Sequence, residues 1–156
     1  MPTFNFVFWD TASGGFLESE GPVIDVVISM PTQLEAWCIT NNFPVPAPVI
    51  GHALIDTGAS ISGIHLPVLE QLSLLPTDFI RLEGATGVEE KAPIFPARVS
   101  FPGLNLNDVT MNMVVGNQVS FHTLKGKNII MLLGRDLLKG FTLIYNGTFN
   151  QIILSH

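Results

Sequence analysis

The 156-residue chain is poor in charge, in cysteine and in long apolar runs, and each shortage excludes a class of protein. Only 13% of its residues are charged, with 13 acidic against 7 basic residues and no basic tract, which argues against nucleic-acid binding. One cysteine, Cys38, excludes an intrachain disulfide framework and a cysteine-cluster metal site. The apolar runs, such as Ile129–Leu133, have the length of a strand and are too short to cross a membrane.

The chain is instead rich in apolar residues, at 47% hydrophobic with a mean hydropathy of +0.42. Its length fits one domain with a sizeable core, and a soluble chain this apolar is expected to bury further surface in an oligomer. The start, MPTFNFVFWD, has neither a basic region nor a long apolar stretch, so no secretory signal is expected. Together with the single cysteine, this predicts a cytoplasmic location.

Turn residues and short apolar runs predict a mostly β domain. The 11 prolines and 14 glycines are spread through the chain, which disfavours long helices. Apolar or alternating segments predict strands at Val23–Ser29, Val49–Asp56, Phe95–Phe101, Met111–Val115, Ile129–Leu133, Phe141–Tyr145 and Phe149–Leu154.

Three other segments complete the predicted pattern. Asn146-Gly147 predicts a tight hairpin turn between the last two strands. Apolar residues near helical spacing make Pro67–Leu75 the best helix candidate. The proline-rich stretch Met30–Pro48 is expected to be a long loop, with a short strand at Ala36–Thr40.

The segment Ala53–Ser60 is the first that points to chemistry. An apolar strand runs directly into Asp56-Thr57-Gly58, and an aspartate in this position costs free energy unless its carboxylate is hydrogen-bonded. Gly58 permits a tight turn that brings its amide to the carboxylate, and the hydroxyl of Ser60 is expected to reach the outer carboxylate oxygen. The alternative is a strand that merely ends in an Asx-turn.

A second segment, Ile129–Leu138, favours a chemical role for Asp56 over a simple Asx-turn. Its apolar strand ends at Gly134, and Arg135-Asp136 then opens a short helix. In this order and spacing, the two segments resemble the retropepsin-like aspartic proteases, the single-lobe relatives of pepsin that include retroviral proteases and bacterial retroviral-type proteases. The resemblance covers roughly residues 21–154, and the closing hairpin is similar to that of the bacterial-type members.

The resemblance implies a fold and a domain organisation. The expected fold is a mostly β, closed barrel lobe with one or two short helices, acting as a symmetric homodimer. Residues 21–156 would form the aspartic protease domain. Residues 1–20 would be an N-terminal leader or edge strand, with a docking arm as the alternative.

The site residues take their roles only through this resemblance, and Asp56 is implied to be catalytic. The active-site loop comprises Thr57, Gly58, Ala59 and Ser60, with the Thr57 hydroxyl bonding to the loop of the other subunit. The support of this loop comprises Leu133, Gly134, Arg135 and Asp136, of which the last two are structural. A flap over the substrate is expected within Arg81–Glu90, at Gly84, Ala85, Thr86, Gly87 and Val88. A solvated glycine turn is the alternative for that segment.

The implied reaction is the hydrolysis of peptide bonds by water. One lobe supplies one aspartate and the reaction uses two, so two copies of Asp56 would face each other across a two-fold axis. Two carboxylates about 3 Å apart share one proton, and this pair performs the acid and base steps. No metal and no cofactor is expected. The expected partners are a second copy of the chain and a polypeptide substrate, not a nucleic acid or a membrane.

The chain departs from the family pattern at three places, one of which is the Met30–Pro48 loop, longer than a minimal retroviral enzyme would need. Many retroviral members have an acidic residue where Ser60 stands, and it pairs with the arginine that matches Arg135; here Arg135 needs another partner. Retroviral enzymes also interleave short terminal strands into a dimer sheet, whereas this chain ends in the Phe141–Leu154 hairpin. This difference makes residues 1–20 a candidate for the dimer contact.

Two other functions stay open at this point. A retropepsin-like domain without activity would serve as a dimerisation or peptide-binding module that holds an extended chain. A latent enzyme would become active once a leader such as residues 1–20 is removed. The four histidines, His52, His65, His122 and His156, have no partner at metal-ligand spacing and are expected to be structural.

Overall fold

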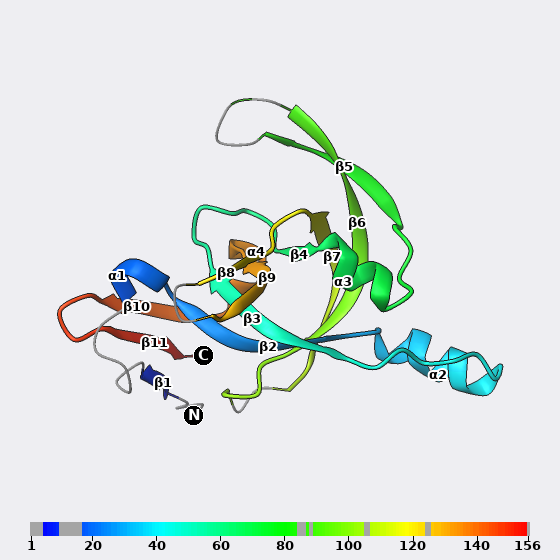
Figure 1. Cartoon of the computed structure of the whole chain (residues 1–156), viewed down its shortest axis with the longest axis horizontal. Helices are drawn as coiled ribbons and strands as arrows, with labels where there is room; N and C mark the ends of the chain where they lie inside the picture. Colours follow the sequence, from blue (N-terminus) through cyan, green and yellow to red (C-terminus); the bar gives the residue numbers. More distant parts are fainter. Residues whose placement is uncertain are drawn as a thin grey trace.

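The computed structural model describes residues 5–9, 17–83, 87, 89–104, 107–123 and 126–155, and most of them belong to short strands (Figure 1). The strands are β1 (Asn5–Trp9), β2 (Val23–Ser29), β3 (Val49–Ile55), β4 (Gly63–His65), β5 (Asp78–Glu83), β6 (Glu89–Ser100), β7 (Val109–Asn117), β8 (Phe121–His122), β9 (Asn128–Leu133), β10 (Thr142–Asn146) and β11 (Gln151–Ser155). The helices are α1 (Leu17–Glu20), α2 (Thr32–Thr40), α3 (Leu66–Gln71) and α4 (Arg135–Leu138). No helix in these ranges is long and apolar enough to cross a membrane.

A ring of 6 strands closes the barrel in the order β2-β3-β9-β4-β7-β6, because β6 pairs back to β2. The closed barrel confirms the predicted architecture. Within the ring, β3 and β9 are parallel neighbours, with Ile55 opposite Leu133. The two segments that follow these strands therefore leave the barrel side by side, although they are far apart in the sequence.

The interior of the barrel is filled by side chains from every part of the ring. The side chains with 0% exposure include Val26, Ile28, Ala53, Ile64, Leu69, Val99, Val114 and Met131. The alternation predicted for Phe95–Phe101 is confirmed, because its odd-numbered residues are all buried. Burial of apolar surface on this scale is the main source of the free energy that holds the lobe together.

The alternation predicted for Met111–Val115 is wrong at Met113, which is 42% exposed while its neighbour Val114 is buried. The pairing of β6 with β7 is irregular around Pro96, where β7 carries one residue more than β6 between paired positions. Proline has no N–H to donate to the hydrogen bonds between strands, so a β-bulge forms here. The extra residue in β7 changes which of its side chains point into the barrel.

The strand expected at Ala36–Thr40 is wrong, because these residues form the second half of α2. The helix projects from the barrel (Figure 1) and leaves Trp37 and Ile39 more than half exposed. A helix with so little buried surface shows no helical apolar pattern in the sequence. Its first turn is anchored to β6 by Arg98, whose Nη2 donates a hydrogen bond to Glu35 Oε2 at 2.6 Å.

The prediction of one or two short helices is too low, since α1 and α2 add to the two expected ones. The helix predicted over Pro67–Leu75 is present as α3, but it starts at Leu66 and ends at Gln71. It ends early because Ser73 adopts a left-handed conformation, with φ of 55°.

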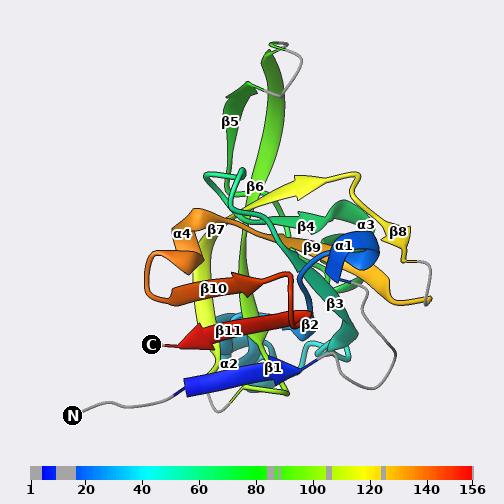
Figure 2. The same ribbon diagram turned by 90° about the vertical axis from the view of Figure 1, so that its left-hand side faces the viewer.

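A small three-stranded sheet, ordered β1-β11-β10, lies beside the barrel (Figure 2). The hairpin of β10 and β11 confirms the predicted pair of strands, but its turn is longer than Asn-Gly alone. Asn146 pairs with Gln151, so residues 147–150 form the turn. Phe149, expected in the second strand, lies in this turn and is 71% exposed. Asn150 has a φ of 49°, which closes the longer turn.

Candidate active site

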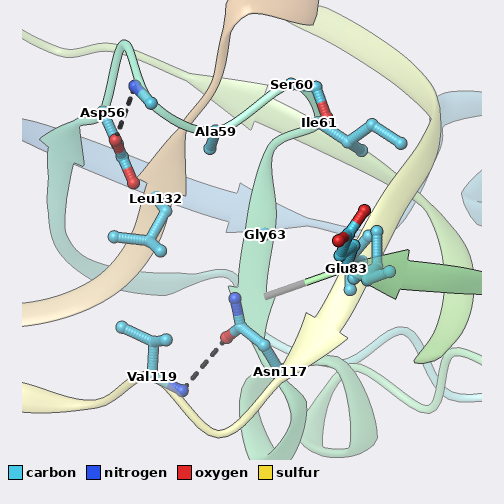
Figure 3. Close-up of a pocket in the computed structure, with 12 residues that line it drawn as sticks. Asp56, Ala59, Ser60, Ile61, Gly63, Glu83, Asn117, Val119 and Leu132 are labelled. Carbon is cyan, nitrogen blue, oxygen red and sulfur yellow. Dashed lines mark hydrogen bonds between the residues drawn. The ribbon is translucent and has the colours of Figure 1, made fainter. Parts of the chain in front are cut away.

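Asp56 lies immediately after β3, at the point where the parallel pairing with β9 ends. Its backbone N–H donates a hydrogen bond to the carbonyl of Leu133 at 2.9 Å. Its carboxylate oxygen Oδ1 accepts a hydrogen bond from the backbone N–H of Gly58, also at 2.9 Å. The other oxygen, Oδ2, makes no hydrogen bond to any residue that the structure describes. One carboxylate oxygen is thus held in place while the other is available at the edge of a cleft (Figure 3).

Gly58 leaves room for the Asp56 carboxylate in the turn that follows it. A Cβ atom at this position would lie 3.0 Å from Asp56 Oδ1, closer than almost all real Cβ contacts. The N–H of Ala59 closes the turn by donating to the carbonyl of Asp56 at 3.2 Å. Thr57 lies at the exposed outer side of the turn. The Asp-Thr-Gly sequence therefore forms a narrow loop that presents its carboxylate.

The end of β9 packs directly behind this loop. A Cβ atom on Gly134 would lie 2.8 Å from the carbonyl carbon of Ile61 and 2.9 Å from the nitrogen of Ser62. Both neighbours are backbone atoms that cannot rotate away. The two chain segments can approach this closely only because residue 134 is glycine.

The structure identifies the partners of Arg135, which the sequence did not reveal. Its Nη1 donates hydrogen bonds to the carbonyls of Thr57, at 2.6 Å, and Gly58, at 3.0 Å. Its backbone N–H donates to the carbonyl of Ala59 at 2.9 Å. The guanidinium therefore holds the Asp-Thr-Gly loop through its backbone, and this needs no acidic side chain at position 60.

Ser60 itself does not reach Asp56. Its side chain is exposed and makes no hydrogen bond within the described part of the chain. Figure 3 shows Ser60 further along the loop, away from the Asp56 carboxylate. The hydrogen bond expected from its hydroxyl is therefore absent.

Ser62 supports the loop, and sequence analysis missed it. It has 0% exposure, and its Oγ donates to Asp136 Oδ1 at 2.6 Å while accepting from the N–H of Gly134 at 2.9 Å. Its backbone N–H donates to Asp136 Oδ2 at 3.0 Å. A buried hydroxyl and a carboxylate thus connect the segment after Asp56 to α4. The available signal was a serine between Ile61 and Gly63, together with an aspartate, Asp136, that had no assigned partner.

A cleft of about 560 Å³ opens beside the loop (Figure 3). Its apolar lining comes from five different strands or loops and includes Ile61, Leu82, Val115, Val119 and Leu132. Its polar lining includes Asn117, whose Oδ1 accepts a hydrogen bond from the N–H of Val119 at 3.1 Å. A Cβ on Gly63 would overlap Asn117 Nδ2, so this side chain lies flat against β4. The cleft is an apolar trough with a carboxylate at its edge.

The hairpin of β5 and β6 rises above the barrel (Figures 1 and 2). Leu82, near the end of β5, is part of the cleft lining. The predicted flap residues Gly84, Ala85, Thr86 and Val88 lie outside the described residues. Gly87 is exposed and has a φ of 72°, a conformation that favours glycine. The flap stays a prediction, and only its stem is seen to border the cleft.

The histidines next to the motif lie outside the cleft lining. His52 Nε2 lies 3.4 Å from Asp25 Oδ1, and its Nδ1 lies 3.3 Å from the carbonyl of Asn128. His65 Nδ1 is buried and has no hydrogen-bond partner among the residues that the structure describes. No group of three or more His, Cys, Asp or Glu residues that could hold a metal ion occurs among the residues described.

The fold and the site define one lobe of a retropepsin-like aspartic protease. A closed barrel presents an Asp-Thr-Gly loop, and a Leu-Gly-Arg-Asp segment packs behind it. A model of the aspartyl protease family matches residues 46–137, which include both segments and more than half of the chain. The chain belongs to this family. No curated protein matches the chain.

Proposed function

We propose that the chain is an aspartic endopeptidase whose active site forms between two copies, each contributing Asp56. The observation that carries this proposal is the position of Asp56, held through Oδ1 by Gly58 and open at the edge of an apolar cleft. An Asp-Thr-Gly loop supplies one aspartate and the reaction needs two. A two-fold axis beside the loop would bring the second aspartate from an identical chain.

The chemistry follows from two carboxylates that share one proton, since two like charges at about 3 Å cannot both ionise without a large cost. The ionised carboxylate takes a proton from a water molecule, and the protonated one donates a hydrogen bond to the scissile carbonyl. Water adds to the carbonyl carbon to form a tetrahedral diol. The carboxylates then exchange roles, and the leaving amine is protonated as the C–N bond breaks.

The loop geometry supports this reaction by fixing the carboxylate before the substrate binds. The Gly58 N–H orients Oδ1, the Leu133 carbonyl fixes the backbone of Asp56, and Arg135 holds the two residues that follow. Positioning of a reacting group in advance lowers the activation barrier because no reorganisation is needed during the reaction.

Cleavage of an unfolded polypeptide by the purified protein, followed from acid to neutral pH, tests this proposal. We expect cleavage within this range, because the reaction needs only the two carboxylates and water. Asp56→Asn should abolish cleavage and leave the dimer intact, whereas Asp108→Asn, an exposed carboxylate outside the cleft, should cleave like the wild type. Full activity in Asp56→Asn would contradict the mechanism. A wild type that dimerises and binds peptides without cleaving them would support the binding-module alternative.

A further inference from the structure

The cleft carries negative charge with no cation in its described lining. Among the described residues that line it, the ionisable ones are Asp56 and Glu83. The other lining residues are apolar, glycine, serine or asparagine. Arg135 lies beside the loop, but it does not line this cleft and its guanidinium is bound to the backbone of Thr57 and Gly58. A substrate group with a positive charge is therefore favoured in this cleft over one with a negative charge.

Glu83 is the carboxylate of the cleft that the proposed mechanism does not use. It is the last residue of β5, its side chain is exposed, and it forms no hydrogen bond or ion pair with any described residue. Lys91 on the neighbouring strand lies over the ring of Phe79, with Nζ 4.8 Å from the ring centre. Glu83 therefore has no ion-pair partner among the residues that the structure describes.

The position of Glu83 separates it from the reacting bond. Figure 3 shows Asp56 and Glu83 on opposite sides of the cleft, with Gly63 between them. The cleft lining that they share is mostly apolar and includes Ile61 and Leu132. A lysine or arginine side chain suits this arrangement, because its methylene stem can lie on apolar surface while its charged end reaches a carboxylate.

We infer that Glu83 is a specificity-determining residue that selects polypeptides with a lysine or arginine flanking the scissile bond. This inference rests on the proposed function, since it names the substrate class of the same cleft. The side chains at the bond itself lie in the apolar part of the cleft near Asp56. The basic side chain occupies the position nearest the stem of the β5–β6 hairpin, where it pairs with the Glu83 carboxylate.

The test compares cleavage of peptides that carry lysine or its neutral analogue acetyl-lysine, placed in turn at each position around the scissile bond. At one position, kcat/KM for the lysine peptide should exceed that for the acetyl-lysine peptide by about threefold, as expected for an exposed ion pair. The preference should shrink as the salt concentration rises. It should disappear in Glu83→Gln, and Glu83→Lys should favour a glutamate peptide at that same position.

Glu70→Gln is the matched control, because Glu70 is an exposed carboxylate on α3 that does not line the cleft. It should keep the wild-type preference for lysine. The inference is overturned if the wild type does not distinguish lysine from acetyl-lysine at any position, or if Glu83→Gln retains the preference.

A binding measurement separates this inference from the proposed function. The same peptides, labelled with a fluorophore, are titrated with Asp56→Asn, and with the double variant that also carries Glu83→Gln. Tighter binding of the lysine peptide that depends on Glu83 supports the inference even if the wild type cleaves nothing, in which case only the proposed function fails. Equal binding of both peptides by the two variants, together with cleavage by the wild type, overturns the inference and leaves the proposed function intact.

Discussion

Replacement of Ser62 by alanine is the most informative perturbation of the support behind the active-site loop. The Ser62 hydroxyl has 0% exposure, donates to Asp136 Oδ1 at 2.6 Å and accepts from the N–H of Gly134 at 2.9 Å. Alanine removes both hydrogen bonds without changing the backbone. Asp136 keeps two other donors, the backbone N–H groups of Ser62 and Leu137. The N–H of Gly134 is left buried without its partner.

The expected loss of unfolding free energy follows from the removal of these two hydrogen bonds. A hydrogen bond to a charged group contributes about 1.5–3 kcal/mol, and a buried donor without a partner costs about 1–3 kcal/mol. The two losses share one hydroxyl and overlap, so the free energy of unfolding should fall by about 3 kcal/mol. For a domain of this size, that corresponds to a decrease in Tm of about 6–12 °C.

Denaturant-induced unfolding of the purified variants measures this change directly. Ser60→Ala is the matched control, because the Ser60 hydroxyl is exposed and makes no hydrogen bond within the described residues; it should differ from the wild type by less than about 0.5 kcal/mol. If Ser62→Ala lost no more free energy of unfolding than Ser60→Ala, the assigned support of the loop by this buried hydroxyl would be refuted.

Two further substitutions test the contacts that hold the loop. Gly134→Ala places a Cβ against the backbone of the preceding loop and should destabilise the fold by about 1–3 kcal/mol, measured by thermal unfolding; Gly140→Ala, whose nearest contact is 3.7 Å, should not. Arg135→Lys removes the planar guanidinium that donates to both loop carbonyls, so the Asp56 carboxylate should be less well positioned. We expect kcat to fall by about tenfold, a modest loss for a displaced reacting group. Lys139→Arg is the control and should leave kcat unchanged. An unfolding temperature of Gly134→Ala equal to that of the wild type, or a kcat of Arg135→Lys equal to that of the wild type, would contradict these assignments.

The part of the site that could be predicted lies in contiguous sequence. Asp56-Thr57-Gly58 is local, and the physical need for glycine beside a buried-strand carboxylate appears in the order of the residues. The second segment could be recognised because Gly134 and Arg135 follow an apolar strand. The parallel pairing of β3 with β9 then places the two segments together, which sequence alone does not show.

The parts that could not be predicted depend on contacts between distant segments. Ser62 gains its role only because the fold brings it against Asp136, which is 74 positions away. Glu83 borders the cleft because of how the β5–β6 hairpin stands on the barrel. Helix α2 was missed because it projects from the lobe and buries too little surface to impose a pattern on its sequence. The shifted facing of Met113 depends on the bulge opposite Pro96.

The central claim is that two chains share one active site, and a subunit-mixing measurement tests it most directly. Wild type and Asp56→Asn are mixed in varying ratios at constant total concentration, under conditions in which subunits exchange, and the initial rate of peptide cleavage is recorded. If each site needs an Asp56 from both chains, the rate falls as the square of the wild-type fraction. A rate that falls in direct proportion to the wild-type fraction would show that a single chain is sufficient and would contradict the account.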